Sequence, residues 1–200
     1  MAATLPEADA LVSLVLASLI VMGSPGPSTV SATAVGAAFG ARRALGYVAG
    51  LVLGTTVILI AVAAGVVALL LSLPRLAPLL VGASALYLAW LAWRIATAPP
   101  LSAPDRAARV PSFAGGVLLG VANPKAWLSI SAVFAGTTMA LGVPVKIGVL
   151  VVMIVVIHAV WLTAGASLAR LLRHPVGARI VNLVLAALLL GTAVLGLLRA

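Results

Sequence analysis

Residues 23–29 read Gly23-Ser24-Pro25-Gly26-Pro27-Ser28-Thr29 and interrupt one long apolar segment, and residues 120–125 read Gly120-Val121-Ala122-Asn123-Pro124-Lys125 and interrupt another. Pro27 and Pro124 lie 97 residues apart, about half of the 200-residue chain. A proline break frees backbone N–H and C=O groups that lipid cannot satisfy, so such breaks are tolerated only inside protein or beside a water-filled cavity. Two breaks at corresponding places in two halves are typical of a transporter's binding site.

The composition places the chain in the membrane. It is 64% hydrophobic and 8% charged, with a mean hydropathy of +1.31. Runs such as Gly50–Leu73 and Val145–Leu168 exceed the roughly 20 residues that a helix needs to cross a bilayer. Because these runs are continuous rather than alternating, they do not favour a β-barrel. We expect an all-α, polytopic membrane protein.

The hydropathy pattern predicts six transmembrane helices within one transmembrane domain, residues 1–200. The longest loop, 98–112, divides the chain into repeat one, about 8–97, and repeat two, about 113–200. Three spans in each half would make the two halves an inverted repeat, with a broken helix opening each half. The expected spans are Ala8–Gly40 (broken at Pro25–Pro27), Ala44–Leu73, Leu76–Ala96, Phe113–Ala140 (broken at Asn123–Pro124), Val145–Leu168 and Val176–Leu198.

The charges predict an orientation for these spans. The formal net charge is +9, and the basic residues sit at span ends and in loops, which favours a membrane protein over a nucleic-acid partner. Excluding Lys125, eight basic residues fall on one predicted side and three on the other, so the termini are expected outside the cytoplasm. The eight are Arg42, Arg43, Arg94, Arg106, Arg109, Arg170, Arg173 and Arg179, and the three are Arg75, Lys146 and Arg199.

Nothing in the sequence indicates catalysis or a bound cofactor. The acids are Glu7, Asp9 and Asp105, all at ends or in loops, and the chain has no cysteine. No His/Asp or His/Glu cluster has metal-ligand spacing, and no phosphate-binding loop appears. The first seven residues carry no Lys or Arg, so we expect the N-terminus to be retained rather than cleaved as a signal peptide. We expect no enzyme, no cofactor and no metal.

The second break is cationic. Asn123 is a good helix N-cap and Pro124 suits the first helical position, so a half-helix should begin here with its N–H groups facing a cavity. Such a helix end attracts anions, and Lys125 adds a full positive charge. This pattern predicts a seat for a substrate carboxylate. The alternative is that the break is only a kink and Lys125 reaches an interface.

The first break is uncharged and rich in hydroxyl groups. Pro25 and Pro27 each remove a backbone donor, and Gly26 permits unusual backbone angles. The hydroxyls of Ser28 and Thr29 either cap the freed backbone groups or bind a polar substrate, and the sequence leaves both open.

Two further features stand out in the predicted spans. His158 lies near the middle of the fifth span and could exchange protons; the alternative is a neutral ring bonded to a hydroxyl such as that of Thr163. Gly46, Gly50 and Gly54 recur every four residues in the second span. A stripe of small residues allows close helix packing, either within the monomer or between subunits of a homo-oligomer.

In this order along the chain, four segments resemble motifs of the lysine exporter (LysE) family, which includes the homoserine/threonine exporters. They are Ser24–Pro27, the stretch from Arg42-Arg43 to Gly50-xxx-Gly54, Ala85–Leu91 and Ala122–Ala126. The resemblance implies an inner-membrane efflux carrier for amino acids or close derivatives, driven by the proton gradient, with homo-oligomers possible. It implies functional roles for six residues: Pro25, Gly26, Pro27, Asn123, Pro124 and Lys125.

The chain departs from that family at three positions. Many members have an acid where this chain has Ser28, a polar residue where it has Ile58, and an aspartate where it has His158. These departures strengthen the interpretation of His158 as functional and argue against a dibasic substrate. Two other classes stay open: a passive channel or pore subunit, which needs no titratable group, and a membrane scaffold whose breaks are dry and packed.

Overall fold

The computed structural model describes residues 7–66, 86, 89–90, 92–93, 96–97, 109–136 and 141–197, and every regular element among them is helical. The all-α expectation is therefore confirmed for this part of the chain. The elements are α1 (Glu7–Ala17), the π-helix η1 (Ser18–Met22), α2 (Pro27–Phe39), α3 (Ala41–Ala63), α6 (Phe113–Val121), α7 (Pro124–Gly136), α8 (Val143–Ser167), α9 (Ala169–Arg173) and α10 (Pro175–Leu197).

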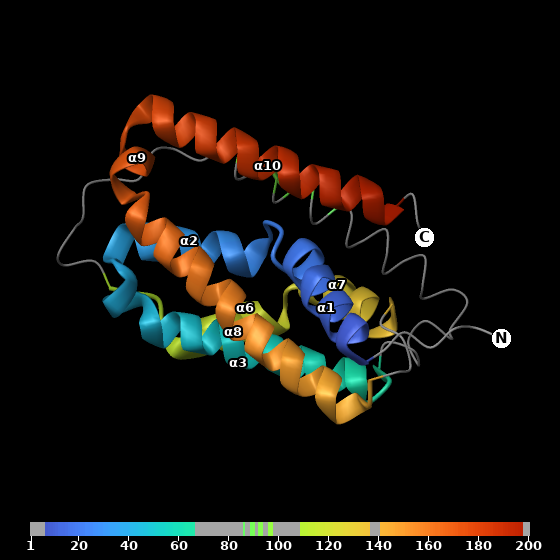
Figure 1. The fold of residues 1–200 in the computed structure, drawn as a ribbon. Coiled ribbons are helices and arrows are strands. Elements are labelled where there is room, and N and C mark those ends of the chain that lie inside the picture. Colours follow the sequence, from blue (N-terminus) through green and yellow to red (C-terminus); the bar gives the residue numbers. More distant parts are fainter. Residues whose placement is uncertain are drawn as a thin grey trace.

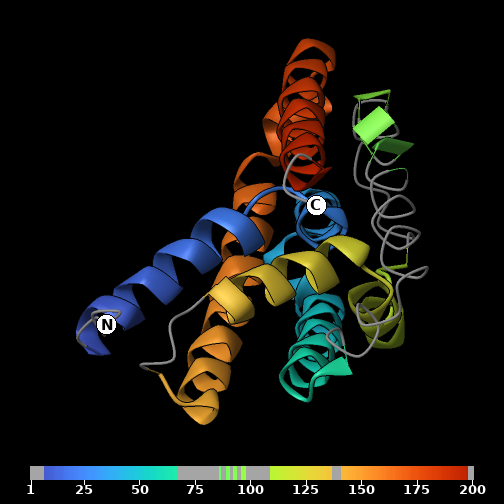
Figure 2. The same cartoon turned by 90° about the vertical axis from the view of Figure 1, so that its right-hand side faces the viewer.

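Two long helices organise the molecule, and each packs against one half of a broken segment. α3 packs along α6. α8 packs along α2 and crosses α3 (Figure 1). α1, η1 and α7 join α3 and α8 in one hydrophobic cluster that contains Leu14, Ile58, Ile130 and Ile154. The chain then turns through α9 into α10, which lies along one side of the bundle (Figure 2).

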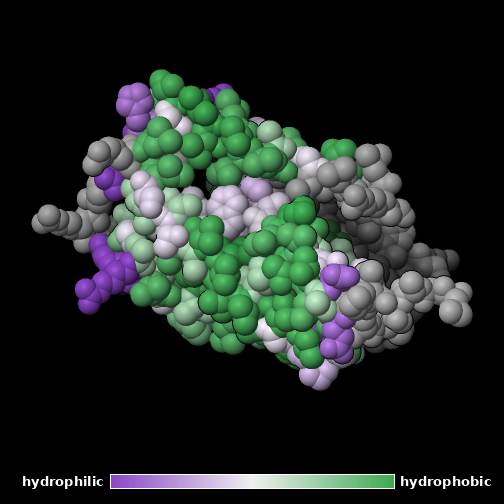
Figure 3. Space-filling view, in the orientation of Figure 1, coloured by the Kyte–Doolittle hydropathy of each residue, from purple (hydrophilic) through white to green (hydrophobic). Residues whose placement is uncertain are grey.

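The polarity of the described part is inverted relative to a water-soluble protein. Large apolar side chains face outward, among them Ile20 and Leu118, which are 72% and 71% exposed. Hydrophobic atoms cover most of the visible face, and hydrophilic ones gather toward its ends (Figure 3). Polar side chains instead lie buried, including those of Asn123, Lys125 and His158. An apolar exterior together with polar side chains buried inside the bundle suits a protein surrounded by lipid.

Two helices, α3 and α8, are each long and apolar enough to cross a membrane, and the count rises to four if each bent pair forms one span. The first pair joins Glu7–Met22 to Pro27–Phe39 with a bend of 70°, and the second joins α6 to α7 with a bend of 59°. Both predicted breaks are therefore confirmed. Most of the predicted third span and the 98–108 part of the long loop lie outside the described residues, so the six-span inverted repeat stays a prediction.

The helix ends follow from local sequence. Pro27 and Pro124 each occupy the first position of a helix, where the missing N–H costs nothing. Ser112 caps α6 by accepting a hydrogen bond from the Gly115 N–H at 3.1 Å. Gly40 separates α2 from α3 with a φ of +79°, a left-handed angle that glycine adopts without strain. The π-helix and α9 were not predicted.

The glycine stripe of α3 divides between two environments. Gly50 and Gly54 face α6 so closely that a Cβ on either would meet the backbone oxygen of Phe113 or Val117. Gly116 and Gly120 of α6 lie equally close to the α3 backbone, so each helix presents a glycine pair to the other. Gly46 lies exposed and apart from this contact.

Candidate functional site

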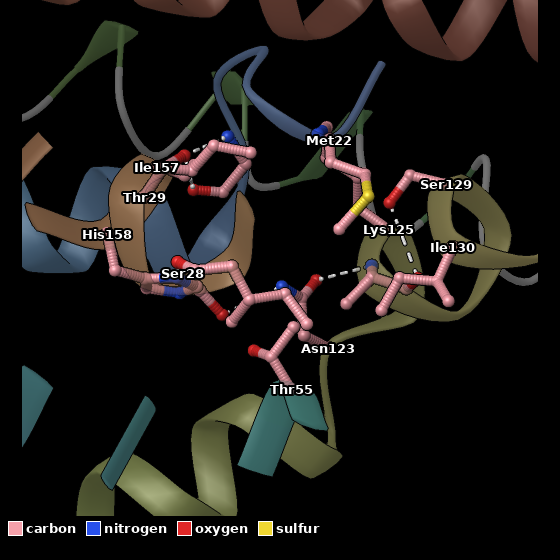
Figure 4. A pocket seen from close by; sticks show the side chains of 13 residues that line it. Met22, Ser28, Thr29, Thr55, Asn123, Lys125, Ser129, Ile130, Ile157 and His158 are labelled. Atoms are coloured by element: carbon pink, nitrogen blue, oxygen red, sulfur yellow. Dashed lines mark hydrogen bonds between the residues drawn. The ribbon is translucent and has the colours of Figure 1, made fainter. Parts of the chain in front are cut away.

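A cavity lies between the two breaks, walled by α2, α3, α7, α8 and η1 (Figure 4). Its volume of about 30 Å³ leaves room for about two water molecules, at roughly 10–15 Å³ each on the same measure. An amino acid is larger, so the cavity must widen to admit one. The lining residues are Met22, Gly26, Ser28, Thr29, Thr55, Asn123, Lys125, Ala126, Ser129, Ile130, Ile154, Ile157 and His158.

Lys125 joins the second break to the first. Its side chain is 7% exposed and its Nζ donates to the carbonyl oxygens of Val21 at 3.1 Å and Ser24 at 3.0 Å. These carbonyls belong to the end of η1 and the turn after it, where backbone acceptors carry partial negative charge. The aliphatic stem of Lys125 passes directly over Gly26, so close that a Cβ at residue 26 would meet its Cδ. The lysine therefore stabilises the broken end of the first segment.

Further side chains complete the backbone bonding at the first break. The indole N–H of Trp161, on α8, donates to the Gly23 carbonyl at 3.0 Å. The hydroxyl of Thr29 accepts from the Gly26 N–H at 2.8 Å, and that of Ser24 donates to the Val21 carbonyl at 2.9 Å. Thr29 and Ser24 thus cap the freed backbone.

The second break is capped mainly by residues near it in sequence. The carbonyl of the Asn123 side chain accepts from the Ala126 N–H at 3.4 Å, and the indole N–H of Trp127 donates to the Val121 carbonyl at 2.9 Å. Asn123 also reaches across the cavity: its Nδ2 donates to the hydroxyl oxygen of Ser28 at 2.8 Å. This bond links the two breaks directly.

His158 is 4% exposed and lies in the cavity wall. Its Nδ1 lies 2.8 Å from the carbonyl oxygen of Ile154. A carbonyl only accepts, so Nδ1 carries the proton and Nε2 is the bare acceptor of the neutral ring. Nε2 has no partner within the described structure. The Thr163 hydroxyl, the partner considered from the sequence, is exposed and donates to the carbonyls of Ala159 and Val160 instead.

The structure brings most of the predicted site residues to one place. Gly26, Ser28, Thr29, Asn123, Lys125 and His158 all line the cavity. Pro25, Pro27 and Pro124 are not among the lining residues and occupy the breaks themselves. The sequence reasoning missed Thr55, although it directly follows Gly54 of the glycine stripe. It also missed Met22, Ala126, Ser129, Ile130, Ile154 and Ile157, which nothing distinguishes from ordinary apolar or small helix residues.

The lining of the cavity carries a positive charge and no negative one. Among its lining residues, Lys125 supplies a cation, His158 supplies a titratable ring, and no carboxylate is present. Within the described part of the chain no three His, Asp, Glu or Cys side chains are grouped as metal ligands would be. The arrangement suits a ligand that brings its own negative charge.

Comparison with known proteins places the chain among transporters. Residues 19–199 match the family described as LysE type translocator. A cysteine/O-acetylserine efflux protein of Salmonella choleraesuis is 32% identical over 184 residues, covering 88% of this chain and 92% of the relative. The protein of the same description from Escherichia coli is 33% identical over 182 residues, with the same coverage. No solved structure matches the chain significantly.

Proposed function

Because the chain belongs to the LysE type translocator family, we propose that it exports a small neutral amino acid or a close derivative, of the cysteine or O-acetylserine kind, across the inner membrane. The names of its relatives support this substrate class, and the likeness extends over 88% of this chain. The protein is a multi-pass membrane protein of a translocator family.

The cavity between the breaks is the observation that carries the proposal. A neutral amino acid is a zwitterion, with one carboxylate and one ammonium group. Lys125 offers three N–H donors, of which two bind the carbonyls of Val21 and Ser24, and the third is proposed to hold the carboxylate. A dibasic substrate would bring a second cation to a wall whose lining residues include no acid.

We propose six spans in two inverted halves, with the cavity opening to each side in turn. The paired breaks support this plan, and the broken helices meet at the cavity as such transporters require. The excess of Arg and Lys on one predicted side supports an orientation with both termini outside the cytoplasm. Proton exchange at His158 would couple export to the proton gradient.

Transport by the purified protein tests the proposal. Proteoliposomes loaded with unlabelled cysteine or O-acetylserine should take up the labelled compound by counterflow, and those loaded with lysine should not. A carrier shows counterflow because its site moves between sides, whereas an open channel does not. Absence of counterflow with both neutral substrates, in vesicles shown to contain folded protein, would overturn the proposal.

A further inference from the structure

We propose that Nε2 of His158 and Oγ1 of Thr55 together hold the ammonium group of the substrate, and that a proton competes with the substrate for the same Nε2 lone pair. This inference rests on the proposed export function and explains how export would be coupled to proton entry. It adds Thr55, which lies outside the two breaks, to the binding site.

The first observation is a pair of unpartnered polar atoms. Thr55 Oγ1 and His158 Nε2 are the buried side-chain polar atoms without a hydrogen-bond partner in the described structure, and both residues line the cavity. Leaving such an atom unpaired costs about 1–3 kcal/mol. They come from different helices, α3 and α8, and lie with Ser28 on one side of the cavity (Figure 4). A ligand that pairs both atoms would recover that cost.

Thr55 behaves unlike Thr33 of α2 and Thr56 of α3. The hydroxyls of Thr33 and Thr56 each donate to the carbonyl four residues earlier, at 2.9 and 2.8 Å. Such a bond satisfies a threonine within its own helix. Thr55 Oγ1 makes no such bond, although it is buried within the bundle. Its hydroxyl is therefore free for a ligand in the cavity.

The chemistry of the two atoms selects an ammonium group. His158 Nε2 is a bare acceptor, since Nδ1 carries the ring proton, and a hydroxyl oxygen accepts as well as it donates. An ammonium group supplies several N–H donors from one atom and can satisfy both. The carboxylate of the same zwitterion would then be directed to Lys125, the other titratable residue of the lining.

The same lone pair gives a coupling mechanism. α2, α3 and η1 contribute Ser28, Thr29, Thr55 and Met22 to the cavity, none of them titratable, so Lys125 is the charged group that shares the cavity with His158. When a proton binds Nε2, the ring becomes an imidazolium that repels an ammonium group and accepts no hydrogen bond. The site therefore holds the substrate or one proton. Export of one substrate is followed by uptake of one proton outside and its release inside.

The first test pairs a protein change with a ligand change. Cysteine and 3-mercaptopropionate, which lacks the amino group, compete against labelled cysteine in counterflow. We expect wild-type protein to prefer cysteine about tenfold or more, as for a buried hydrogen bond to a charged group. Thr55→Val should lower that preference severalfold, and Thr56→Val, the matched control on the adjacent residue, should leave it unchanged.

The second test removes the titratable ring of residue 158 but keeps a hydrogen-bond acceptor there. His158→Gln offers an amide oxygen that accepts a hydrogen bond and does not titrate. We expect counterflow by this variant to be slower than that of wild-type protein but still measurable, and accumulation driven by a pH gradient to be lost. Its cysteine affinity should no longer weaken as the medium is acidified. This variant also tests the inference if Thr55→Val fails to fold.

The outcomes separate the inference from the proposed function. No counterflow by wild-type protein would overturn both. Wild-type counterflow with equal affinity for cysteine and 3-mercaptopropionate would overturn the ammonium site alone, because the two atoms would then be paired by water. Undiminished proton-driven accumulation by His158→Gln would overturn the competition at Nε2 and leave export itself standing.

Discussion

The two breaks of this molecule differ in where their hydrogen-bond donors come from. At the first break, carbonyls of Val21, Gly23 and Ser24 accept hydrogen bonds from Lys125 and Trp161, which lie more than 100 residues away in the sequence. At the second, caps come from Asn123 and Trp127, within six residues of their partners. The first break thus needs distant donors in addition to its local caps at Ser24 and Thr29, whereas the second break is capped locally and also supports the first through Lys125. Any widening of the cavity that moves η1 must disturb the Lys125 bonds, whereas α6 and α7 can keep theirs.

The largest effect is expected from Lys125→Met, which removes the support that the second break gives the first. The Ser24 carbonyl loses its Lys125 donor and the Val21 carbonyl keeps the Ser24 hydroxyl as its side-chain donor, so the free energy of unfolding should fall by about 1–3 kcal/mol. Transport should fall about tenfold or more, since the substrate carboxylate also loses its cation. Thermal unfolding in detergent and cysteine counterflow measure the two effects.

Lys146→Met is the matched control. Lys146 is buried to nearly the same degree, 8% against 7% exposed, but lies over the Phe134 ring with its Nζ 5.4 Å from the centroid. Its loss should leave counterflow within about twofold of wild type. Equal loss of transport in both variants would mean that the effect of Lys125→Met is general to buried lysines and not particular to the break.

The next largest effect is expected from Gly26→Ala. The added methyl group would meet the stem of Lys125 and force it off the first break. We expect several-fold slower counterflow and a free energy of unfolding lower by about 1–3 kcal/mol, as for overpacking. Gly148→Ala is the control, because a Cβ there meets nothing within 4 Å. That variant should be as stable as wild type or more so, by up to about 1 kcal/mol.

The sequence predicted the positions of both breaks because prolines inside apolar runs permit few backbone arrangements. It also predicted the cap at Asn123 and most of the polar cavity wall, since polar side chains in a lipid-embedded chain must turn inward. The sequence did not predict the hydrogen-bond partners of these residues. That Lys125 binds the carbonyls of Val21 and Ser24 depends on how α7 meets η1, which no local pattern encodes.

The sequence also did not predict that Thr55 lines the cavity. α3 and α8 are apolar around nearly their whole circumference, so periodicity does not say which face meets the cavity. Thr55 and Thr56 look alike in the sequence, and the α3–α6 contact through Gly50 and Gly54 decides which of them is turned inward. The π-helix at Ser18–Met22 likewise has no sequence signal of its own.

A smaller effect is expected from the bond that joins the breaks, Asn123 Nδ2 to Ser28 Oγ. Asn123→Ala should lower stability more than Ser28→Ala, because Asn123 also caps α7. In a double-mutant cycle the coupling energy should be about 0.5–1.5 kcal/mol. A coupling near zero, measured by unfolding in detergent, would mean that this bond does not couple the two breaks and that the second break supports the first through Lys125 alone.

The smallest effect, and the sharpest comparison, comes from the two tryptophan caps. Trp161→Phe and Trp127→Phe each remove one indole N–H from a backbone carbonyl, at Gly23 and Val121 respectively, and keep an aromatic ring. Each should cost about 0.5–1.5 kcal/mol of stability.

The effects of the two substitutions on transport should differ. Trp161→Phe loosens the break that depends on distant donors and should change the counterflow rate. Trp127→Phe acts within a break that keeps its Asn123 cap and should leave the rate close to wild type. Equal changes in rate would show that both breaks move during the cycle, as a symmetric inverted repeat would require.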